Sequence, residues 1–385
     1  MIIGLDHLKV KNLRMLKKWR GDVIGSMKKI KVIHQVLDPS GSGGVSAEFR
    51  ALKKSELTQY YEFVPMILVD FHSGINLKDI NYYYKFIKKE NPDIVHVRGA
   101  AVDGLNAIIA AKLAHRGKIL VTVHGMYSDL VYISKVKKWI SKHVVEKLIF
   151  DLSDGISCVC KNATNRSYFD KYRKKMLPYV YNRMPQFSIY LKEEYREEVR
   201  RLYGLDSEDI VALYVGRMTK EKGLEVFLNA IKKMQFSWPE HLKILFVGDG
   251  SYKSFLENEC VEFRDKIFFA GDQRNVEKFY DAADFFIQPS LHENHSISLL
   301  EACAAKLPCI ATKCGGNTEI VNDQTTGIII PANDVNALVD AIEKMMDVTT
   351  RTYYLENIAR EDYTKFSPKE TDTALNKVYQ MLLER

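Results

Sequence analysis

The stretch DFFIQPSLHENHSISLLEACAAKLPCIATKCGG, residues 284–316, contains two short apolar runs on either side of a helical pattern. The runs at 284–290 and 308–316 predict strands, and ISLLEACAAK between them has the composition of a helix that ends before Pro308. Strands that are apolar on both faces and alternate with helices are typical of parallel sheets. This stretch therefore predicts a strand, helix, strand unit of a parallel α/β sheet.

The same alternation recurs along most of the chain, in two series whose boundary we place near residues 183–195, in a polar and mainly helical stretch. Apolar runs predict strands at 29–37, 63–69, 93–99, 118–125 and 155–160, and then at 210–217, 243–250, 266–271, 284–290, 308–316 and 327–331. Two such series predict two Rossmann-like, doubly wound α/β domains. Because open parallel sheets bind ligands beyond the carboxyl ends of their strands, we expect the site in a cleft between two facing domains.

Composition bounds the class of protein. A chain of 385 residues with 46% hydrophobic residues is long enough for two domains, each with its own core. Six cysteines without a CxxC pair indicate neither a zinc site nor a disulfide framework, so we expect a reducing, cytoplasmic compartment. No apolar run is long enough for a membrane-spanning helix or a signal peptide. The net charge of +7 favours acidic partners such as anionic lipid or a phosphorylated substrate, and we find no nucleic-acid-binding motif.

The first candidate site is the loop LDPSGSGGVSAEF at residues 37–49, which follows the first predicted strand. Gly41, Gly43 and Gly44 would let the backbone approach a ligand closely, and the N–H groups there could bind a diphosphate. The alternative is a plain turn, for which glycine is equally suited.

A second candidate is YVGRMTKEKG, residues 214–223, in which a predicted strand ends at Gly216. Arg217 and Lys222 follow in the loop and the helix start. A guanidinium binds a phosphate through two parallel hydrogen bonds, whereas an ammonium acts as a point charge, so the two together suit a diphosphate. The alternative is a pair of solvated basic residues.

The third candidate is a pair of glutamates, Glu293 and Glu301, with seven residues between them. We expect Glu293 in a loop at the cleft and Glu301 about two turns into the next helix, on a side that faces the same site. The N–H groups of residues 294–297 at the helix start could bind a phosphate. An ordinary exposed pair of carboxylates is the alternative.

Two histidine patterns lead to different expectations. The HENH segment, residues 292–295, spaces its histidines by three residues and not by the four of a metalloprotease helix, so we expect no metal site there. His124 ends a predicted strand at the same cleft edge as the glycine loop, where its ring could contact a substrate. A buried histidine with satisfied hydrogen bonds is the alternative.

Together these motifs resemble the retaining, nucleotide-sugar-dependent glycosyltransferases of the GT-B fold, in the large group classed as family 4. The resemblance begins near Lys29 and is strongest between Val215 and Pro331. Its most specific element is the E-x7-E pair formed by Glu293 and Glu301. The supporting matches are GRMTKEKG, FVGDG, YDAADFFIQPS and GGNTEIVNDQTTGIIIPANDVNAL.

The resemblance implies a role for each candidate residue. Arg217 and Lys222 would bind the donor diphosphate, and Glu301 would hydrogen-bond the nucleotide ribose. Glu293 and His124 would lie beside the donor sugar and, with Arg217 and Lys222, would make up the catalytic set. The further residues assigned to donor binding are Gly216, Asn294, His295, Ser296 and Ile297, together with Gly43 and Gly44 of the glycine loop. Glycine is common after the first glutamate in this family, whereas this chain has Asn294.

The resemblance also implies a division of the chain. Residues 29–190 would form an acceptor-binding domain, and residues 191–365 a domain that binds the nucleotide-sugar donor. Residues 366–385 would form a helix that packs back on the first domain. Residues 1–28 would be an extension, because Met27 begins MKKIKVIHQVL, which resembles a usual family start.

The implied activity moves a sugar from a nucleotide-diphosphate sugar to a glycan or lipid-linked acceptor, with retention of anomeric configuration, in surface polysaccharide or glycoconjugate synthesis. Departure of the nucleotide diphosphate builds negative charge that fixed cations and N–H dipoles stabilise. Because Arg217 and Lys222 supply positive charge and no DxD motif is evident, we expect neither a metal ion nor a cofactor. Two alternatives stay open, a nucleotide-sugar epimerase of the same fold and a non-catalytic nucleotide-sugar-binding protein.

Residues 134–150, SKVKKWISKHVVEKLIF, predict a basic amphipathic helix, and residues 14–31 add further positive charge. Its apolar side would consist of Val136, Trp139, Ile140, Val144 and Leu148. Such a helix can lie on an anionic membrane, which would place the protein at the inner membrane face. The alternative is an ordinary surface helix with its apolar side in the core.

Overall fold

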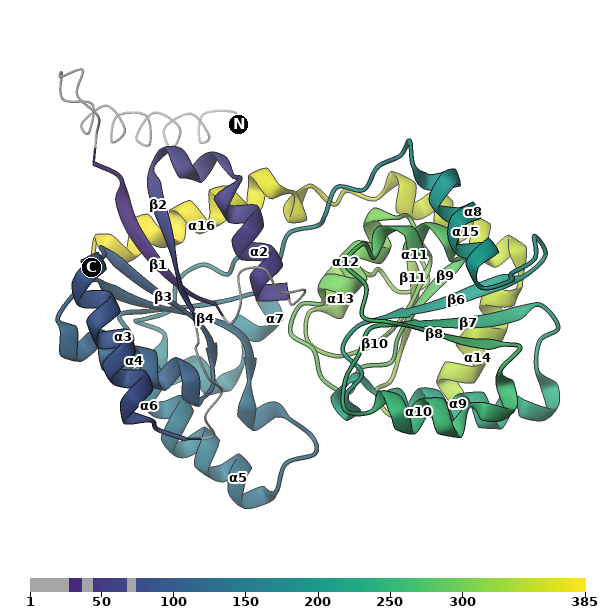
Figure 1. Cartoon of the computed structure of the whole chain (residues 1–385), viewed down its shortest axis with the longest axis horizontal. Coiled ribbons are helices and arrows are strands. Elements are labelled where there is room, and N and C mark those ends of the chain that lie inside the picture. The colour runs from purple at the N-terminus through teal and green to yellow at the C-terminus, as the bar shows by residue number, and fades with distance from the viewer. Residues whose placement is uncertain (1–27, 37–43, 68–73) are drawn as a thin grey trace, which may run out of the picture.

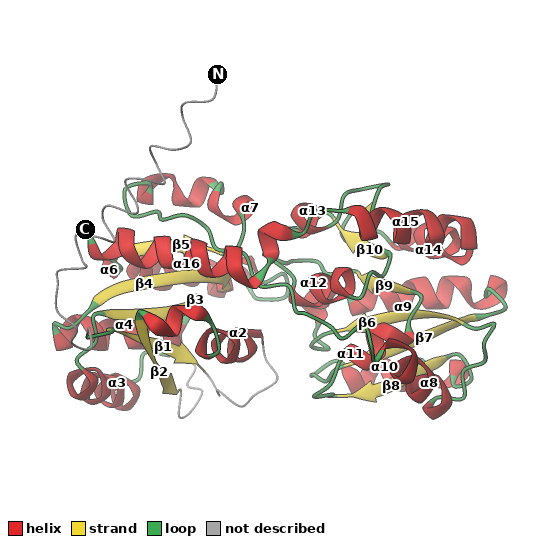
Figure 2. Ribbon diagram, turned by 90° about the horizontal axis from the view of Figure 1, so that it is seen from above, coloured by secondary structure: helices red, strands yellow, loops and turns green. Residues whose placement is uncertain are grey.

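The computed structural model describes residues 28–36, 44–67 and 74–385. These residues form two α/β domains that lie side by side, each built on a parallel sheet with helices on both faces (Figure 1 and Figure 2). Gly41, Gly43 and all of the expected N-terminal extension except residue 28 lie outside the described residues. Within the described ranges, no helix is both long enough and apolar enough to cross a bilayer.

The first sheet has five parallel strands in the order β2-β1-β3-β4-β5. Its strands are β1 (Ile30–Val36), β2 (Tyr61–Ile67), β3 (Ile94–Ala100), β4 (Lys118–Met126) and β5 (Gly155–Cys158). The helices of this part of the chain are α2 (Gly44–Lys53), α3 (Leu77–Glu90), α4 (Val102–Ala114), α5 (Lys135–Ile140), α6 (Glu146–Leu152) and α7 (Lys161–Thr164). Successive strand residues point to opposite faces, so Ile33 packs with α3, α4 and α6, whereas Val32 packs with α2.

The second sheet has six parallel strands in the order β11-β10-β9-β6-β7-β8. They are β6 (Ile210–Val215), β7 (Leu242–Val247), β8 (Ile267–Gly271), β9 (Phe285–Gln288), β10 (Cys309–Thr312) and β11 (Gly327–Ile330). The helices are α8 (Lys192–Leu202), α9 (Leu224–Met234), α10 (Lys253–Glu259), α11 (Glu277–Ala282), α12 (Ile297–Ala304), α13 (Asn317–Ile320), α14 (Val335–Met346) and α15 (Val348–Arg360). Ala212 and Leu213 of β6 belong to the cores on opposite faces of this sheet.

The C-terminal helix α16 (Pro368–Leu383) leaves the second domain and lies along the first sheet, on the face that α2 also covers (Figure 1). Its buried Tyr379 hydroxyl lies 3.0 Å from His34 Nε2 on β1 and 2.9 Å from His96 Nδ1 on β3. Tyr61 of β2 donates to Asn376 Oδ1 at 2.7 Å. The end of the chain thereby becomes part of the core of the first domain.

The predicted fold class is confirmed, because each predicted strand position carries a strand of one of two parallel sheets with helices between them. The strand order of the second sheet is the Rossmann order, with a reversal between β6 and β9. In the first sheet the order reverses between β1 and β3. Loops that leave these strands at their carboxyl ends diverge at each reversal and leave room for a ligand.

Candidate active site

The reversal between β6 and β9 brings together residues that lie far apart in the sequence. Arg217 and Lys222 follow β6, whereas Glu293 follows β9, and β6 pairs directly with β9 in the sheet. Parallel strands have their carboxyl ends at the same edge, so both loops lie at one end of the second sheet. This edge faces the first domain.

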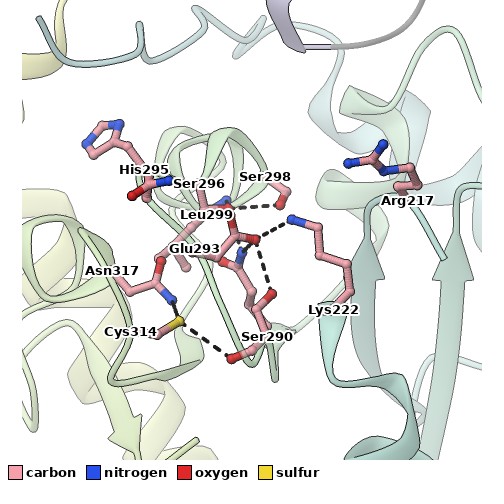
Figure 3. Close-up of polar contacts among 12 residues, drawn as sticks. Arg217, Lys222, Ser290, Glu293, His295, Ser296, Ser298, Leu299, Cys314 and Asn317 are labelled. Atoms are coloured by element: carbon pink, nitrogen blue, oxygen red, sulfur yellow. Dashed lines mark hydrogen bonds and ion pairs between the residues drawn. The ribbon is translucent and has the colours of Figure 1, made fainter. Parts of the chain in front are cut away.

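Glu293 is held by three donors that converge on one of its oxygens. Lys222 Nζ forms an ion pair with Oε1, which also accepts from Gln288 Nε2 at 2.9 Å and from Ser290 Oγ at 3.1 Å (Figure 3). Donors of this kind stabilise the ionised carboxylate and fix its direction. Gln288 and Ser290 were missed by the sequence reasoning, although a glutamine in an otherwise apolar strand end is a usable signal.

Arg217 lies beside this group, and its guanidinium has no partner in the part of the chain that the structure describes. Its main-chain oxygen accepts from Tyr214 Oη at 3.1 Å, but its exposed guanidinium forms no hydrogen bond or ion pair within the described part of the chain. Figure 3 shows it on the same side of the site as Lys222. An anion bound between the two side chains would meet Arg217, which is unpaired among the described residues, and Lys222, whose charge Glu293 partly neutralises.

Glycines allow the loops of this site to pack backbone against backbone. Gly223, with φ +69°, lies so close to the loop after β9 that a Cβ would be 1.8 Å from the oxygen of Pro289. Gly315, with φ +51°, is equally close to the oxygen of Glu293. No other residue type combines a positive φ with this clearance. Both glycines lie in the sequence motifs quoted above, and the close packing of the loops explains why glycine is required at these positions.

Helix α12 begins at the site and presents the positive end of its dipole. Ser296 caps it by accepting from Leu299 N–H at 3.2 Å, and Ser296 Oγ also accepts from Gln288 Nε2 at 2.7 Å. The N–H groups of Ile297 and Ser298 have no acceptor among the described residues, as expected for a first turn. Gly44, at the start of α2 in the first domain, lies against the side chain of Ile297.

Glu301 lies four residues after Ile297, the first residue of α12, which is about one helical turn into the helix. The expectation of two turns was wrong, because the predicted helix began at the same residue and four residues make only about one turn. The Tyr280 hydroxyl donates to Glu301 Oε2 at 2.8 Å and also lies 3.1 Å from the main-chain oxygen of Ser298. Burial raises the pKa of Glu301 to about 7, although the bond from Tyr280 opposes this. Glu301 is therefore a carboxyl group that titrates near neutral pH.

His124 reaches the site from the first domain, at the end of β4. Its Nε2 is buried without a partner in the described structure, and its main-chain oxygen accepts from Asn294 Nδ2 at 2.9 Å. Burial lowers the pKa of His124 to about 4, against the opposing charge of Glu48 and with a smaller contribution from Arg98. The ring is therefore neutral at physiological pH.

Glu48 and Arg98 form a charged pair in the first domain that sequence reasoning missed. Arg98, with only 2% of its side chain exposed, is ion-paired to Glu48 of α2, and its Nε donates to His34 Nδ1 at 3.3 Å. Burial acts to raise the pKa of Glu48, but Arg98, His124 and Arg183 outweigh it, so the pKa is lowered. Nothing in the local pattern SAEFR distinguishes Glu48 from an ordinary helix residue.

The histidines of HENH point to different partners. His292 Nε2 lies 3.5 Å from Asp129 Oδ2 in the first domain, whereas the His295 ring stacks on Tyr181 with ring centres 4.9 Å apart. In the described ranges, no three His, Cys, Asp or Glu side chains are grouped as metal ligands. The main-chain N–H of His295 remains the group through which it could contact a donor.

Two Rossmann-like domains with charged strand-end loops at their junction define the GT-B class of glycosyltransferases. The family model described as "Glycosyl transferases group 1" matches residues 195–362, and the model described as "Glycosyltransferase Family 4" matches residues 45–166. The chain belongs to the glycosyltransferase family that these two models describe together, and it is a glycosyltransferase.

A curated relative and two solved structures are similar to this chain. The chain is 26% identical over 352 residues to the Escherichia coli UDP-Gal:alpha-D-GlcNAc-diphosphoundecaprenol alpha-1,3-galactosyltransferase, covering 83% of this chain and 88% of that protein. The fold resembles sucrose-phosphate synthase from Thermosynechococcus elongatus, with a TM-score of 0.73, 17% identity and coverage of 92% and 100%. It also resembles Anabaena HepE solved with UDP and glucose, with a TM-score of 0.71, 16% identity and coverage of 91% and 99%.

Proposed function

We propose that this glycosyltransferase moves a sugar from a nucleotide-diphosphate sugar to a hydroxyl of a glycan or lipid-linked acceptor, with retention of anomeric configuration. The observation that carries the proposal is the placement of Lys222, Arg217 and Glu293 together where the second sheet reverses its strand order. The diphosphate would bind between Arg217 and Lys222, and the ribose would donate hydrogen bonds to Glu301. The sugar would then lie beside Glu293 and face His124.

These residues match the charges that develop during the reaction. The bond between the anomeric carbon and the diphosphate oxygen breaks, which leaves negative charge on phosphate and positive character on the sugar ring. Arg217, Lys222 and the N–H groups at the start of α12 would stabilise the negative charge on the phosphate. The carboxylate of Glu293 would stabilise the positive character of the sugar ring. We propose that these groups suffice without a metal ion or cofactor.

Retention is best explained by attack of the acceptor on the same face as the leaving diphosphate. The new bond joins the acceptor oxygen to the anomeric carbon, and the acceptor proton passes to the departing phosphate oxygen. The three hydrogen bonds that Glu293 Oε1 accepts from Lys222, Gln288 and Ser290 draw negative charge from the carboxylate and so lower its nucleophilicity. A covalent intermediate on Glu293 is accordingly the less favoured route.

The relative from Escherichia coli acts, by its name, on a sugar linked to diphosphoundecaprenol. A lipid-linked acceptor of a surface polysaccharide or glycoconjugate pathway is the corresponding proposal for this chain. The test is a panel of UDP-, GDP-, ADP- and dTDP-sugars, each incubated with the protein and with lipid-linked and free glycan acceptors. Mass spectrometry would detect the transferred sugar, and NMR would give its anomeric configuration.

The other outcomes of this panel identify the alternatives. An epimerase would rearrange the donor sugar without transferring it, and a non-catalytic binder would only raise the melting temperature with a nucleotide. An inverted anomeric product would disprove the retaining mechanism while leaving glycosyl transfer intact.

A basic and apolar surface supports a membrane-bound acceptor. Residues 134–150 form α5, a π-helical turn at Ser141–Val145 and α6, and all five predicted apolar side chains are 37–67% exposed rather than buried in the core. The side chains of this segment that are buried are Ser141, Glu146, Ile149 and Phe150. Glu146 accepts from Ser128 Oγ at 2.9 Å and from Ser141 Oγ at 3.0 Å. We propose that this surface binds anionic lipid at the inner membrane face, since apolar residues flanked by lysines favour that contact.

A further inference from the structure

Residues His292–His295 connect the two domains, although they belong to the second. His292 lies 3.5 Å from Asp129, Asn294 donates to the oxygen of His124, and the oxygen of His295 accepts from Asn182 Nδ2 at 2.7 Å. Glu293 alone points back into its own domain, toward Lys222. Three of these four residues therefore contact the first domain, whereas Glu293 contacts Lys222 in its own domain.

Asn294 is fixed at both its side chain and its main chain. Its amide donates to His124 O at 2.9 Å, and its own oxygen accepts from Cys160 Sγ at 3.1 Å and from Gly316 N–H at 2.6 Å. Only 5% of Asn294 is exposed, so these bonds are shielded from water. A Cβ at Gly316 would lie 2.5 Å from the Asn294 oxygen, which shows how closely the loops approach.

A second connection reinforces the first. Glu319 of α13 accepts from the main-chain N–H groups of Lys161 at 3.1 Å and Asn162 at 2.7 Å, at the start of α7 in the first domain. The Tyr181 hydroxyl donates to the same carboxylate at 2.7 Å. The contacts through Asn294 and Glu319 therefore lie on neighbouring loops of one interface.

We propose that Asn294 is a positioning residue that sets His124 against Glu293 and holds the two domains together before a donor binds. The proposal rests on the catalytic roles given above to Glu293 and His124. Asn294 directly follows Glu293 in the chain and its amide ends on the backbone of His124, so one side chain fixes the separation of residues from different domains. A glycine at this position would have no amide with which to make the bond.

The first test uses Asn294→Asp, which keeps the size of the side chain but replaces the donating NH₂ with an oxygen that faces His124 O. Without any donor, hydrogen exchange in residues 121–129 and 158–166 should become about tenfold faster, as expected for loss of one interdomain hydrogen bond. Small-angle scattering should show a larger radius of gyration. Unchanged exchange and an unchanged radius would overturn the proposal.

Asn336→Asp is the matched control, because Asn336 is on α14 and its side chain contacts only Lys233 among the described residues. Asn294→Ala serves as the second variant in case the aspartate prevents folding, which circular dichroism would reveal. It removes the donor without adding charge, and the same faster exchange is expected.

The second test separates positioning from a general structural role. With the donor found by the panel above, Asn294→Ala should lower kcat about tenfold or more and leave the donor KM within about twofold, because the amide orients His124 while the cations that bind the diphosphate stay in place. A rise in donor KM with unchanged kcat would contradict the proposal. If no donor is turned over by the unmodified protein, the proposed function fails, whereas the exchange and scattering measurements still decide whether Asn294 joins the domains.

Discussion

Lys222 and Glu293 form an ion pair between the loops that follow β6 and β9, the two strands at which the second sheet reverses its order. The pair joins residues 71 positions apart in the sequence. This ion pair orients both side chains before any substrate is present. Lys222 is the cation proposed for the donor diphosphate, and Glu293 is the carboxylate proposed for the donor sugar.

Replacing Arg217 or Lys222 with alanine should separate catalysis from folding. Each variant should lose about 100-fold or more in kcat, because each removes a fixed positive charge that faces the leaving group. The free energy of unfolding should change by less than about 1 kcal/mol, since Arg217 makes no side-chain bond in the described structure and Lys222 is part-exposed. Initial rates and urea denaturation would measure the two effects.

Arg264→Ala is the control for these variants, because Arg264 is an exposed arginine that precedes β8, at the opposite edge of the same sheet. It should leave the rate unchanged. Unmodified turnover in both Arg217→Ala and Lys222→Ala would contradict the assignment of the diphosphate site.

Nucleotide affinity should depend on the ionisation of Glu301. A carboxylate accepts hydrogen bonds from ribose hydroxyls more strongly than a carboxylic acid does, so nucleotide binding should strengthen as pH rises through about 7, the pKa of the partly buried Glu301. Calorimetric titration of UDP, GDP or ADP in buffers of different ionisation enthalpy should show proton release on binding near neutral pH. Glu301→Gln should remove this pH dependence, and a dependence that persisted in the variant would locate the titrating group elsewhere.

The same carboxyl group should make the unliganded protein less stable at higher pH. A pKa raised above its unfolded value gives a contribution to stability that is full below about pH 4.5 and is lost as pH rises through about 7, a change on the order of 3 kcal/mol. Comparing unmodified protein with Glu301→Gln by denaturant unfolding at several pH values isolates this contribution. The free energy of unfolding of Glu301→Gln, relative to that of the unmodified protein, should increase as pH rises.

Removing only one charge of the Glu48–Arg98 pair should destabilise the first domain more than removing both charges. Glu48→Ala leaves a guanidinium with 2% exposure without its carboxylate and should lower the free energy of unfolding by about 3 kcal/mol. The double variant Glu48→Leu, Arg98→Met replaces both charges by apolar groups and should lose less than that. Guanidinium chloride unfolding would measure both, and a larger loss in the double variant would show that other contacts of Arg98 dominate.

Two glycines with similar backbone angles should respond very differently to alanine. Gly223 has φ +69° and no room for a Cβ, whereas Gly204 has φ +60° and no described atom within 4 Å of the place that a Cβ would take. Gly204→Ala should cost only the backbone strain of about 1 kcal/mol. Gly223→Ala should cost several times more and also reduce turnover, because it would push apart the loops that carry Lys222 and Glu293. Equal melting temperatures in the two variants would contradict the packing of these loops.

Membrane binding should require both the apolar and the basic side chains of residues 134–150. The double variant Trp139→Ser, Val144→Ser should weaken sedimentation with phosphatidylglycerol vesicles by about tenfold or more, since each side chain contributes about 1–3 kcal/mol when buried in lipid. Lys137→Glu, Lys138→Glu should weaken it most at low salt, because each lysine near an anionic surface contributes about 1 kcal/mol.

The matched control for the apolar pair is Phe236→Ser, Leu202→Ser, two exposed apolar residues of the second domain. These changes should leave vesicle binding intact. Salt-insensitive binding, or no binding of the unmodified protein to phosphatidylglycerol vesicles, would rule out the proposed lipid surface.

Local sequence patterns were sufficient for the fold class, because a buried parallel strand and the helix after it each leave a periodic signature within about ten residues. The glutamate pair and the loop GRMTKEKG were likewise visible without a structure. The exposure of Trp139 and Val144 was not, because an amphipathic pattern does not tell which of its apolar residues face the core, and here Ile149 and Phe150 do.

What the sequence alone determined was therefore the identity of the strands, the helices and the main chemical groups, all of which depend on near neighbours. Tertiary structure alone decided which of these groups meet. Gln288 supports Glu293 because the strand end turns it inward, and Asn294 reaches His124 across 170 positions of sequence because the domains face each other. Such contacts depend on strand order and domain placement, which no local pattern contains.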